Sequence, residues 1–194
     1  MVSKPQSEAR ITPPTDEELT PATRKILEGY PPLNVLRMMA RAPASFEPLV
    51  KFAMSILLES EFNARKREIA VLRVAHVTKS EYEWTHHVTV GKQVGLNEDE
   101  IARIAVDGPV TALDEEGNLL CRVADEISRD VRFSDEALGA IVGRYGERQA
   151  TELILCCCYF NMLSRFLEST RVELEDGLEL ERASDGTREL FDAS

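Results

Sequence analysis

Apolar residues recur at intervals of three and four through most of the chain, which is the spacing of one buried helix face. The spacing is clearest between residues 45 and 58, at Phe46, Leu49, Val50, Ala53, Met54 and Leu57. Almost nowhere do apolar and polar residues alternate, as they would in a half-buried strand. The pattern therefore predicts an all-α chain.

Start and stop signals divide this pattern into segments. The predicted helices span about 20–30, 33–42, 45–58, 64–78, 80–94, 97–106, 119–127, 134–145 and 147–170. Asn63 is expected to cap the helix that follows it, and Pro43 is expected to close the helix before it. Gly95 and Gly146 stand where a left-handed residue would end a helix.

Two short motifs predict helix starts through a capping box, in which side chain and backbone bond reciprocally. One pairs Ser80 with Glu83, and the other pairs Asn97 with Glu100. The basic run Arg65-Lys66-Arg67 is expected to form a solvated helix start.

The helical pattern is not interrupted by a convincing linker, so a single domain is expected. Residues 1–19 are expected to form an extended N-terminal arm, since three of the nine prolines lie among the first 18 residues. Residues 20–172 form the predicted helical domain. Residues 173–194 are expected to form an acidic tail, in which the helical spacing of apolar residues is weak.

The net charge of -11 disfavours two classes of partner, nucleic acid and anionic membrane surfaces. We find no apolar run of the roughly 18–20 residues that span a bilayer, and no apolar signal-peptide core near the start. Three of the four cysteines are consecutive, Cys156 to Cys158, which does not suggest a disulfide framework. A cytoplasmic protein is therefore expected.

The three histidines, His76, His86 and His87, all lie in the predicted hairpin of residues 64–94. Glu83 and His87 are four residues apart and share one helix face. If the two helices pack antiparallel, Glu68 can approach His87 from the preceding helix. The result would be a carboxylate–imidazole group for proton transfer.

Glu83 and His87 also have a purely structural interpretation. Capping alone would explain Glu83, and His87 could be an ordinary half-buried histidine. A metal site is not expected. The adjacent residues His86 and His87 point about 100° apart on a helix, and no HExxH motif is present.

Three segments together resemble the core of the carboxymuconolactone decarboxylase family. They are REIAVLRVA at 67–75, SEYEWTHH at 80–87 and GLNEDEI at 95–101. The likeness continues at Leu119-Leu120, Ala124-Asp125-Glu126 and YFNMLSRF at 159–166, and covers roughly residues 30–172. The resemblance implies an alkylhydroperoxidase D-like helical bundle. It also implies a homo-oligomer, such as a dimer, trimer or hexamer, with sites near subunit contacts.

Relatives of this kind fall into two chemical classes, lactone-type decarboxylases and peroxidase-like reductases. The reductases carry a Glu, a Cys-x-x-Cys pair and a His, because thiol redox cycling needs two sulfurs and a base. The matching positions here are Glu68, Ser80, Glu83 and His87, so the acid and the imidazole remain while both sulfurs are absent. Cys121 and Cys156 to Cys158 form no such pair, and we expect them to be buried as small apolar residues.

The resemblance therefore implies a cofactor-independent lyase that decarboxylates a small carboxylated lactone or related unsaturated acid. Neither a metal nor an organic cofactor is required, because the conjugated carbonyl of such a substrate takes up the electrons. His87 is the expected proton donor, Glu68 and Glu83 would set its protonation state, and His86 is a second-rank donor.

The candidates for substrate binding are Arg73, Arg165, Tyr82 and Ser80. An equally favoured interpretation of Arg165 is a structural ion pair with Asp125. Alternatives for the whole protein are a lactone hydrolase or isomerase on the same scaffold, a peroxidase-like reductase, and a non-catalytic oligomeric binding protein.

Overall fold

The computed structural model of the protein describes residues 10–176 and residue 185. All regular structure in this part of the chain is helical, as the sequence predicts. The helices are α1 (Pro21–Leu27), α2 (Asn34–Met39), α3 (Pro43–Met54), the π-helical turn η1 (Ser55–Glu59), α4 (Ala64–Thr78), α5 (Glu81–Gln93), α6 (Glu98–Ile104), α7 (Glu115–Asp130) and α8 (Asp135–Thr170).

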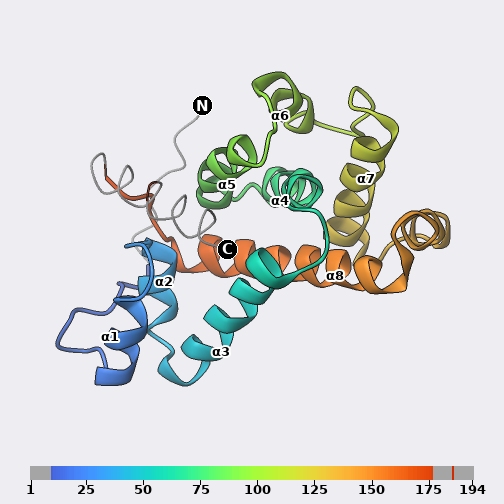
Figure 1. Ribbon diagram of the computed structural model, residues 1–194. Coiled ribbons are helices and arrows are strands. Elements are labelled where there is room, and N and C mark those ends of the chain that lie inside the picture. Colours follow the sequence, from blue (N-terminus) through green and yellow to red (C-terminus); the bar gives the residue numbers. More distant parts are fainter. Residues whose placement is uncertain (1–9, 177–184, 186–194) are drawn as a thin grey trace.

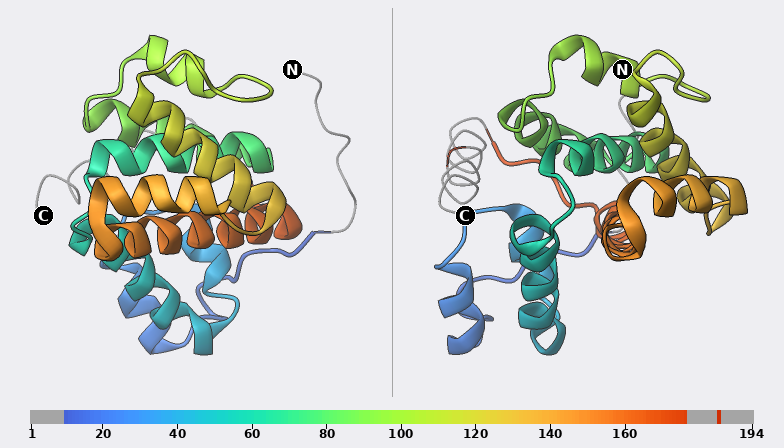
Figure 2. Two further views of the ribbon diagram at one scale, coloured as in Figure 1. Left: turned by 90° about the vertical axis from the view of Figure 1, so that its right-hand side faces the viewer. Right: turned by 45° about the vertical axis from the view of Figure 1, so that its right-hand side comes forward.

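Helix α4 lies at the centre of the bundle. It packs against α5, α7 and α8, and α6 also contacts it. The first three helices lie on the opposite side of α8 from α5 and α6 (Figures 1 and 2). Every residue of α4 from Arg67 to Ala75 is buried, so its polar side chains must find partners inside the protein.

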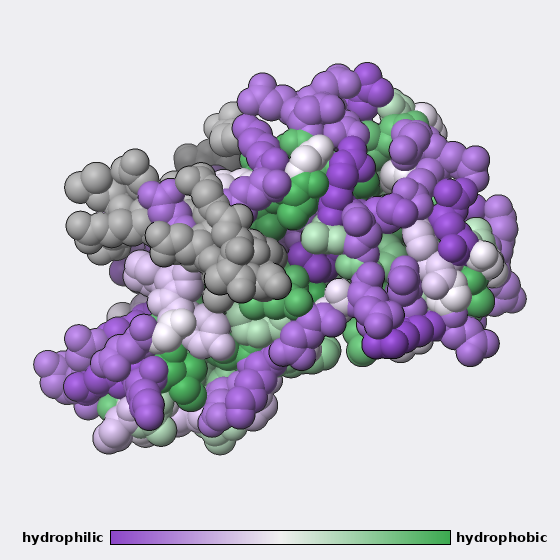
Figure 3. All heavy atoms as spheres, viewed as in Figure 1, coloured by the Kyte–Doolittle hydropathy of each residue, from purple (hydrophilic) through white to green (hydrophobic). Residues whose placement is uncertain are grey.

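In the part of the chain that the structure describes, few large apolar residues are exposed. Figure 3 shows a mostly hydrophilic face, with apolar residues gathered across its middle. The exposed ones include Phe52 on α3 and Leu155 and Met162 on α8.

Most of the predicted helix signals are confirmed. The Asn63 side chain accepts from the N–H of Lys66, and Asn97 and Glu100 form the complete capping box. Gly95 and Gly146 have φ of 94° and 76°, in the left-handed region that glycine adopts without strain. The second of these divides α8 into the two helices that the sequence predicts.

Three local predictions are wrong. Pro43 begins α3 instead of closing α2, because proline is well suited to the first helical position, where its missing N–H is not needed. The third helix changes to π-helical geometry at Ser55. Ser80 precedes α5 as expected, but its hydroxyl does not cap the helix, and the Glu83 carboxyl bonds Ser164 instead.

The part of the predicted arm that the structure describes contains no helix and lies against α2 and the turn that follows it. Arg37 Nε donates to the carbonyl of Pro14 over 2.7 Å, and Arg41 Nη2 donates to that of Thr12 over 2.8 Å. Residues 1–9 of the arm, and residues 177–184 and 186–194 of the tail, lie outside the described residues.

Contrary to the sequence-based expectation, α8 contains a window long and apolar enough to cross a bilayer by length and composition. Core helices share these properties, and more than half of this window is buried within the protein.

Candidate active site

A buried carboxylate and an imidazole meet between the two helices of the predicted hairpin. Glu68 of α4 has no exposed surface, and its Oε2 lies 2.7 Å from Nδ1 of His87 on α5. The Phe160 ring from α8 packs against the His87 ring in a T-shaped arrangement, with centroids 4.8 Å apart and planes at 87°. Because Nδ1 is engaged with Glu68, Nε2 is the ring nitrogen left for a substrate.

The second oxygen of Glu68 faces Arg67, which was expected to lie in solvent. Arg67 is instead only 2% exposed, with Nε 3.4 Å from Glu68 Oε1 and Nη1 3.4 Å from the carbonyl of Ile56. Its Nη2 has no hydrogen-bond partner in the structure. The guanidinium therefore places a buried positive charge beside the carboxylate of the Glu68–His87 pair. Amphipathic spacing did not reveal this residue, because α4 is buried on every side.

Glu83 belongs to a different cluster from the one predicted. Its Oε2 accepts a hydrogen bond from Ser164 on α8, and the Ser164 hydroxyl lies 2.8 Å from that of Thr78. Burial raises the pKa of Glu83 to about 8, although the nearby hydroxyls of Ser164 and Ser80 lower it. Glu83 is thus mostly a neutral acid at pH 7, and its expected contact with His87 is replaced by the one with Ser164.

His86 and Tyr82 contact Glu175, a residue of the predicted C-terminal tail. Glu175 is only 4% exposed, and its carboxylate lies 2.8 Å from His86 Nε2 and 2.5 Å from the Tyr82 hydroxyl. It also accepts from the backbone N–H of Asn34, at the start of α2, over 2.6 Å.

Burial alone would raise the pKa of Glu175. The hydrogen bonds from His86, Tyr82 and Asn34 outweigh burial and lower it, so this carboxylate is charged at neutral pH. Burial and the neighbouring charge of Glu175 raise the pKa of Tyr82. No pattern in the tail sequence could have shown these contacts, which depend on the packing of segments more than 80 residues apart.

Arg73 does not lie with the other candidate residues. It is fully buried and bonds Asp125 through two of its three side-chain nitrogens, Nε at 2.7 Å and Nη2 at 2.9 Å. It also donates to the carbonyl of Ile104, the last residue of α6, and to the carbonyls of Val106 and Gly108 in the loop that follows. These contacts occupy the guanidinium, so Arg73 joins α4 to α7 and to the loop after α6.

Arg165 does not form the ion pair that was weighed for it, because Asp125 is bound by Arg73. It is exposed, and its Nη1 donates to the carbonyl and side-chain oxygens of Asn161, one turn earlier on α8. Neither contact brings it to the Glu68–His87 pair.

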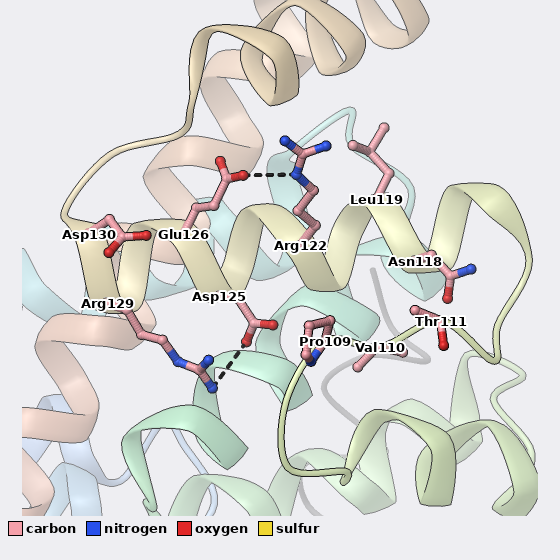
Figure 4. A pocket seen from close by; sticks show the side chains of 10 residues that line it. All are labelled: Pro109, Val110, Thr111, Asn118, Leu119, Arg122, Asp125, Glu126, Arg129 and Asp130. Carbon is pink, nitrogen blue, oxygen red and sulfur yellow. Dashed lines mark hydrogen bonds and ion pairs between the residues drawn. The ribbon is translucent and has the colours of Figure 1, made fainter.

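A pocket of about 520 Å³ runs along α7 and is lined by residues such as Arg122, Asp125 and Arg129 (Figure 4). None of Glu68, Glu83 and His87 lines it. A second pocket, of about 380 Å³, lies where α4 ends and α5 begins, and Ser80 forms part of its wall.

The cysteines offer no reactive thiolate. Cys121, Cys156 and Cys157 are buried as expected, whereas Cys158 is exposed. Burial raises the pKa of all four thiols, so they are protonated at neutral pH. Among the described residues, no three His, Cys, Asp or Glu side chains are grouped to hold a metal ion.

Solved structures share this fold over almost the whole chain. An uncharacterised peroxidase-related protein of Silicibacter sp. TM1040 aligns with a TM-score of 0.74 at 17% identity, over 94% of this chain and 98% of its own. A second uncharacterised peroxidase-related protein, with an alkylhydroperoxidase AhpD core, from Ralstonia eutropha JMP134, aligns with a TM-score of 0.73 at 12% identity, over 93% and 98%.

A third structure is a protein of unknown function from Agrobacterium tumefaciens, described as a candidate antioxidant defence protein AhpD. It aligns with a TM-score of 0.60 at 18% identity, over 71% of this chain and 96% of its own. At these identities the likeness establishes the fold and not the activity. No curated protein matches the chain in sequence.

The sequence itself matches the carboxymuconolactone decarboxylase family over residues 43–126, a range that includes Glu68, Ser80, Glu83 and His87. This match covers residues 43–126, and the chain has the alkylhydroperoxidase D-like fold of the similar solved structures.

Proposed function

We propose that the protein is a cofactor-independent lyase that removes carbon dioxide from a small carboxylated lactone or a related unsaturated acid. The observation that carries this proposal is the 2.7 Å contact between the buried Glu68 carboxylate and Nδ1 of His87. A carboxylate in this position fixes the orientation of the imidazole ring and leaves Nε2 to face a substrate, as general acid catalysis requires.

In the proposed reaction, the carbon–carbon bond to the substrate carboxylate breaks and carbon dioxide leaves. The electron pair moves through the conjugated double bond to the carbonyl oxygen, which gives an enolate. His87 in its protonated form then donates the proton on Nε2 to the carbon that lost the carboxylate. Water returns a proton to His87, so each turnover consumes one proton from the solution.

The surroundings of the Glu68–His87 pair support this chemistry. The Phe160 ring covers one side of the imidazole and keeps water from that side. Four residues before His87 on α5, the neutral Glu83 carboxyl can donate a hydrogen bond without adding a negative charge that would repel an anionic substrate. Other acid–base reactions, such as lactone hydrolysis or isomerisation, would use the same groups.

Peroxide reduction is the competing activity, because two of the similar structures are named as peroxidase-related. Such a reaction needs a thiolate within reach of a second thiol. In this chain Ser80 and Glu83 stand at the positions where the resemblance places the cysteines, and the thiols present have raised pKa values. We therefore propose that the family's thiol chemistry has been replaced by acid–base chemistry here.

We also propose that the protein acts as a cytoplasmic homo-oligomer. Exposed apolar side chains on α3 and α8, among them Phe52, Leu155 and Met162, support association with a second copy. Size measurement in solution by light scattering tests this directly.

The decisive experiment is a screen for carbon dioxide release from unsaturated lactone acids and β-keto acids, run beside a peroxide-reduction assay. Release that His87→Ala abolishes supports the proposal. Peroxide reduction without carbon dioxide release from any of these acids would overturn it.

A further inference from the structure

Arg67 is buried beside the Glu68–His87 pair, yet its guanidinium forms few hydrogen bonds. Nε lies 3.4 Å from Glu68 Oε1, and Nη1 lies 3.4 Å from the carbonyl oxygen of Ile56 in the π-helical turn η1. Both contacts are longer than an ordinary N–H···O hydrogen bond. Nη2 has no partner among the described residues, so much of the donor capacity of this guanidinium is unused.

Arg73, on the same helix, shows how a buried arginine with a structural role is bonded. It makes five contacts of 2.6–2.9 Å, two to Asp125 and three to backbone carbonyls. Arg67 lies six residues earlier on α4 and makes no contact of this length. A buried charge costs free energy unless good hydrogen bonds or an opposite charge offset the cost. Hydrogen bonding therefore does not account for Arg67, and its charge remains as the explanation.

The charge of Arg67 acts on Glu68 even over this longer distance. A hydrogen bond weakens steeply as its geometry degrades, whereas the attraction between two charges falls only with the inverse of their separation. Both side chains are buried, so salt and solvent screen the attraction little. Arg67 and Glu68 thus form a pair without net charge, and the other oxygen of that carboxylate contacts His87.

The other ionisable groups near Glu68 add no charge to this pair at neutral pH. On α8, Cys156 interacts electrostatically with both Glu68 and Arg67, but burial raises the pKa of its thiol and keeps it neutral. On α5, burial raises the pKa of Glu83 to about 8, so it is mostly a neutral acid at pH 7. On η1, the acid is Glu59, which is exposed to solvent.

The two cations before Arg67 on α4 contact acids of other helices. Arg65 bonds Glu100 on α6, and Lys66 Nζ bonds Glu116 on α7 over 2.8 Å. Of these three consecutive cations, Arg67 is therefore the one that faces the buried carboxylate.

We infer that Arg67 is a positioning residue for the proton chemistry of His87, because its charge offsets that of Glu68. Glu68 can then orient the imidazole ring without retaining the proton of that ring. A carboxylate with no cation beside it favours the protonated imidazole and makes it a weaker acid. The inference rests on the proposed function, in which His87 gives up a proton in each turnover, and it names the residue that controls this step.

The test measures the protonation of the His87 ring in the full-length protein labelled with 15N-histidine. At a fixed neutral pH, the NMR signals of the ring nitrogens report how much of the ring is doubly protonated, and their loss in His87→Ala assigns them. Arg67→Met is expected to move these signals toward the doubly protonated ring, because the carboxylate is no longer offset. Glu68→Gln is expected to move them the opposite way, and the double variant should return them close to the wild-type values.

Two further variants separate charge from local structure. Arg67→Lys keeps the charge but changes the hydrogen-bonding geometry, so it should keep the wild-type His87 signals. Lys66→Met removes the same charge from the adjacent residue, which bonds Glu116, and should leave the signals unchanged. Circular dichroism checks that each variant is folded.

The double variant also replaces Arg67→Met if that protein does not fold, because the double variant carries neither buried charge. Its His87 signals are then compared with those of Glu68→Gln. Signals closer to the doubly protonated ring in the double variant support the inference, whereas equal signals in the two proteins overturn it.

Turnover gives a second readout that separates this inference from the proposed function. Arg67→Met is expected to lower kcat for carbon dioxide release about 10-fold with KM unchanged, a smaller loss than in His87→Ala because the proton donor is still present. His87 signals that change as expected, in a protein that releases no carbon dioxide, would support the role of Arg67 and refute the lyase. Carbon dioxide release with identical His87 signals in wild type and Arg67→Met would support the lyase and refute the role of Arg67.

Discussion

His86 and His87 are adjacent in the sequence, yet each binds a different buried carboxylate. His87 Nδ1 lies 2.7 Å from Glu68 on α4, and His86 Nε2 lies 2.8 Å from Glu175 in the C-terminal segment. Successive residues on a helix point about 100° apart, so one turn of α5 serves two separate clusters. The Glu68–His87 pair contacts the centre of the bundle, and the Glu175–His86 pair contacts the start of α2.

The first prediction concerns the Glu68–His87 pair. His87→Ala is expected to lower kcat for carbon dioxide release by about two to four orders of magnitude, which is the range for loss of a general acid. Glu68→Gln keeps the shape of the side chain but removes its charge, so it should lower kcat as well. Stopped-flow measurement of proton uptake gives both values, and an unchanged kcat in His87→Ala would exclude this histidine from the mechanism.

The second prediction concerns the pH dependence of stability. The pKa of Glu83 is raised to about 8 in the folded protein, from an ordinary value of 4.5. The folded state therefore holds this proton more tightly than the unfolded chain, and the stabilisation is lost as pH rises from about 4.5 to about 8.

Urea denaturation between pH 5 and 9 measures this effect. Glu83→Gln, which cannot ionise, should flatten the decline by up to ~1.4 kcal/mol per pH unit. Glu81→Gln is the control, because Glu81 is an exposed acid in the same helical turn. Identical pH profiles for wild type and Glu83→Gln would mean that Glu83 is already ionised in the folded protein.

The third prediction concerns Glu175. Glu175→Ala leaves His86, Tyr82 and the Asn34 N–H without their acceptor, so the free energy of unfolding should fall by about 1–3 kcal/mol. Its lowered folded pKa implies a stabilisation that is present at neutral pH and lost as pH falls through that pKa. Glu173 is an exposed neighbour whose side chain pairs with the exposed Arg10, so Glu173→Ala should have little effect. Equal denaturation midpoints for the two variants would count against a role for Glu175.

The fourth prediction separates structural from substrate-binding arginines. Arg73→Met removes the bidentate partner of the partly buried Asp125, which keeps a longer contact of 3.7 Å with Arg129, and should reduce stability by about 3–5 kcal/mol. Any variant protein that remains folded should keep the wild-type KM, since Arg73 has no free donor for a substrate. Arg165→Ala should change stability little, because Arg165 is exposed. A raised KM in a fully stable Arg73→Met variant would restore it as a substrate contact.

The sequence predicted the local structure well, because local structure depends on nearby residues. Apolar spacing located the helices, and Asn63, Gly95 and Gly146 marked their ends. The meeting of Glu68 and His87 was also predictable, since a short turn forces the two helices of the hairpin to pack antiparallel.

Contacts between distant segments were not predictable. Glu175 reaches Tyr82 across 93 positions, and Ser164 reaches Glu83 across 81. Arg67 seemed an exposed charge because its neighbours are basic, whereas the central position of α4 buries it. The roles of these residues depend on the packing of whole helices, which one sequence without aligned relatives does not specify.

The burial of α4 has a consequence for how the protein can vary. Glu68 and Arg73 lie five residues apart on one rigid helix, and the bonds of Arg73 to Asp125 and to the carbonyls after α6 fix that helix along its length. A random mutagenesis screen for lost turnover should therefore recover changes at Asp125 and in the segment 104–108. Such changes would move the Glu68 carboxylate away from His87, although the changed residues do not contact the substrate.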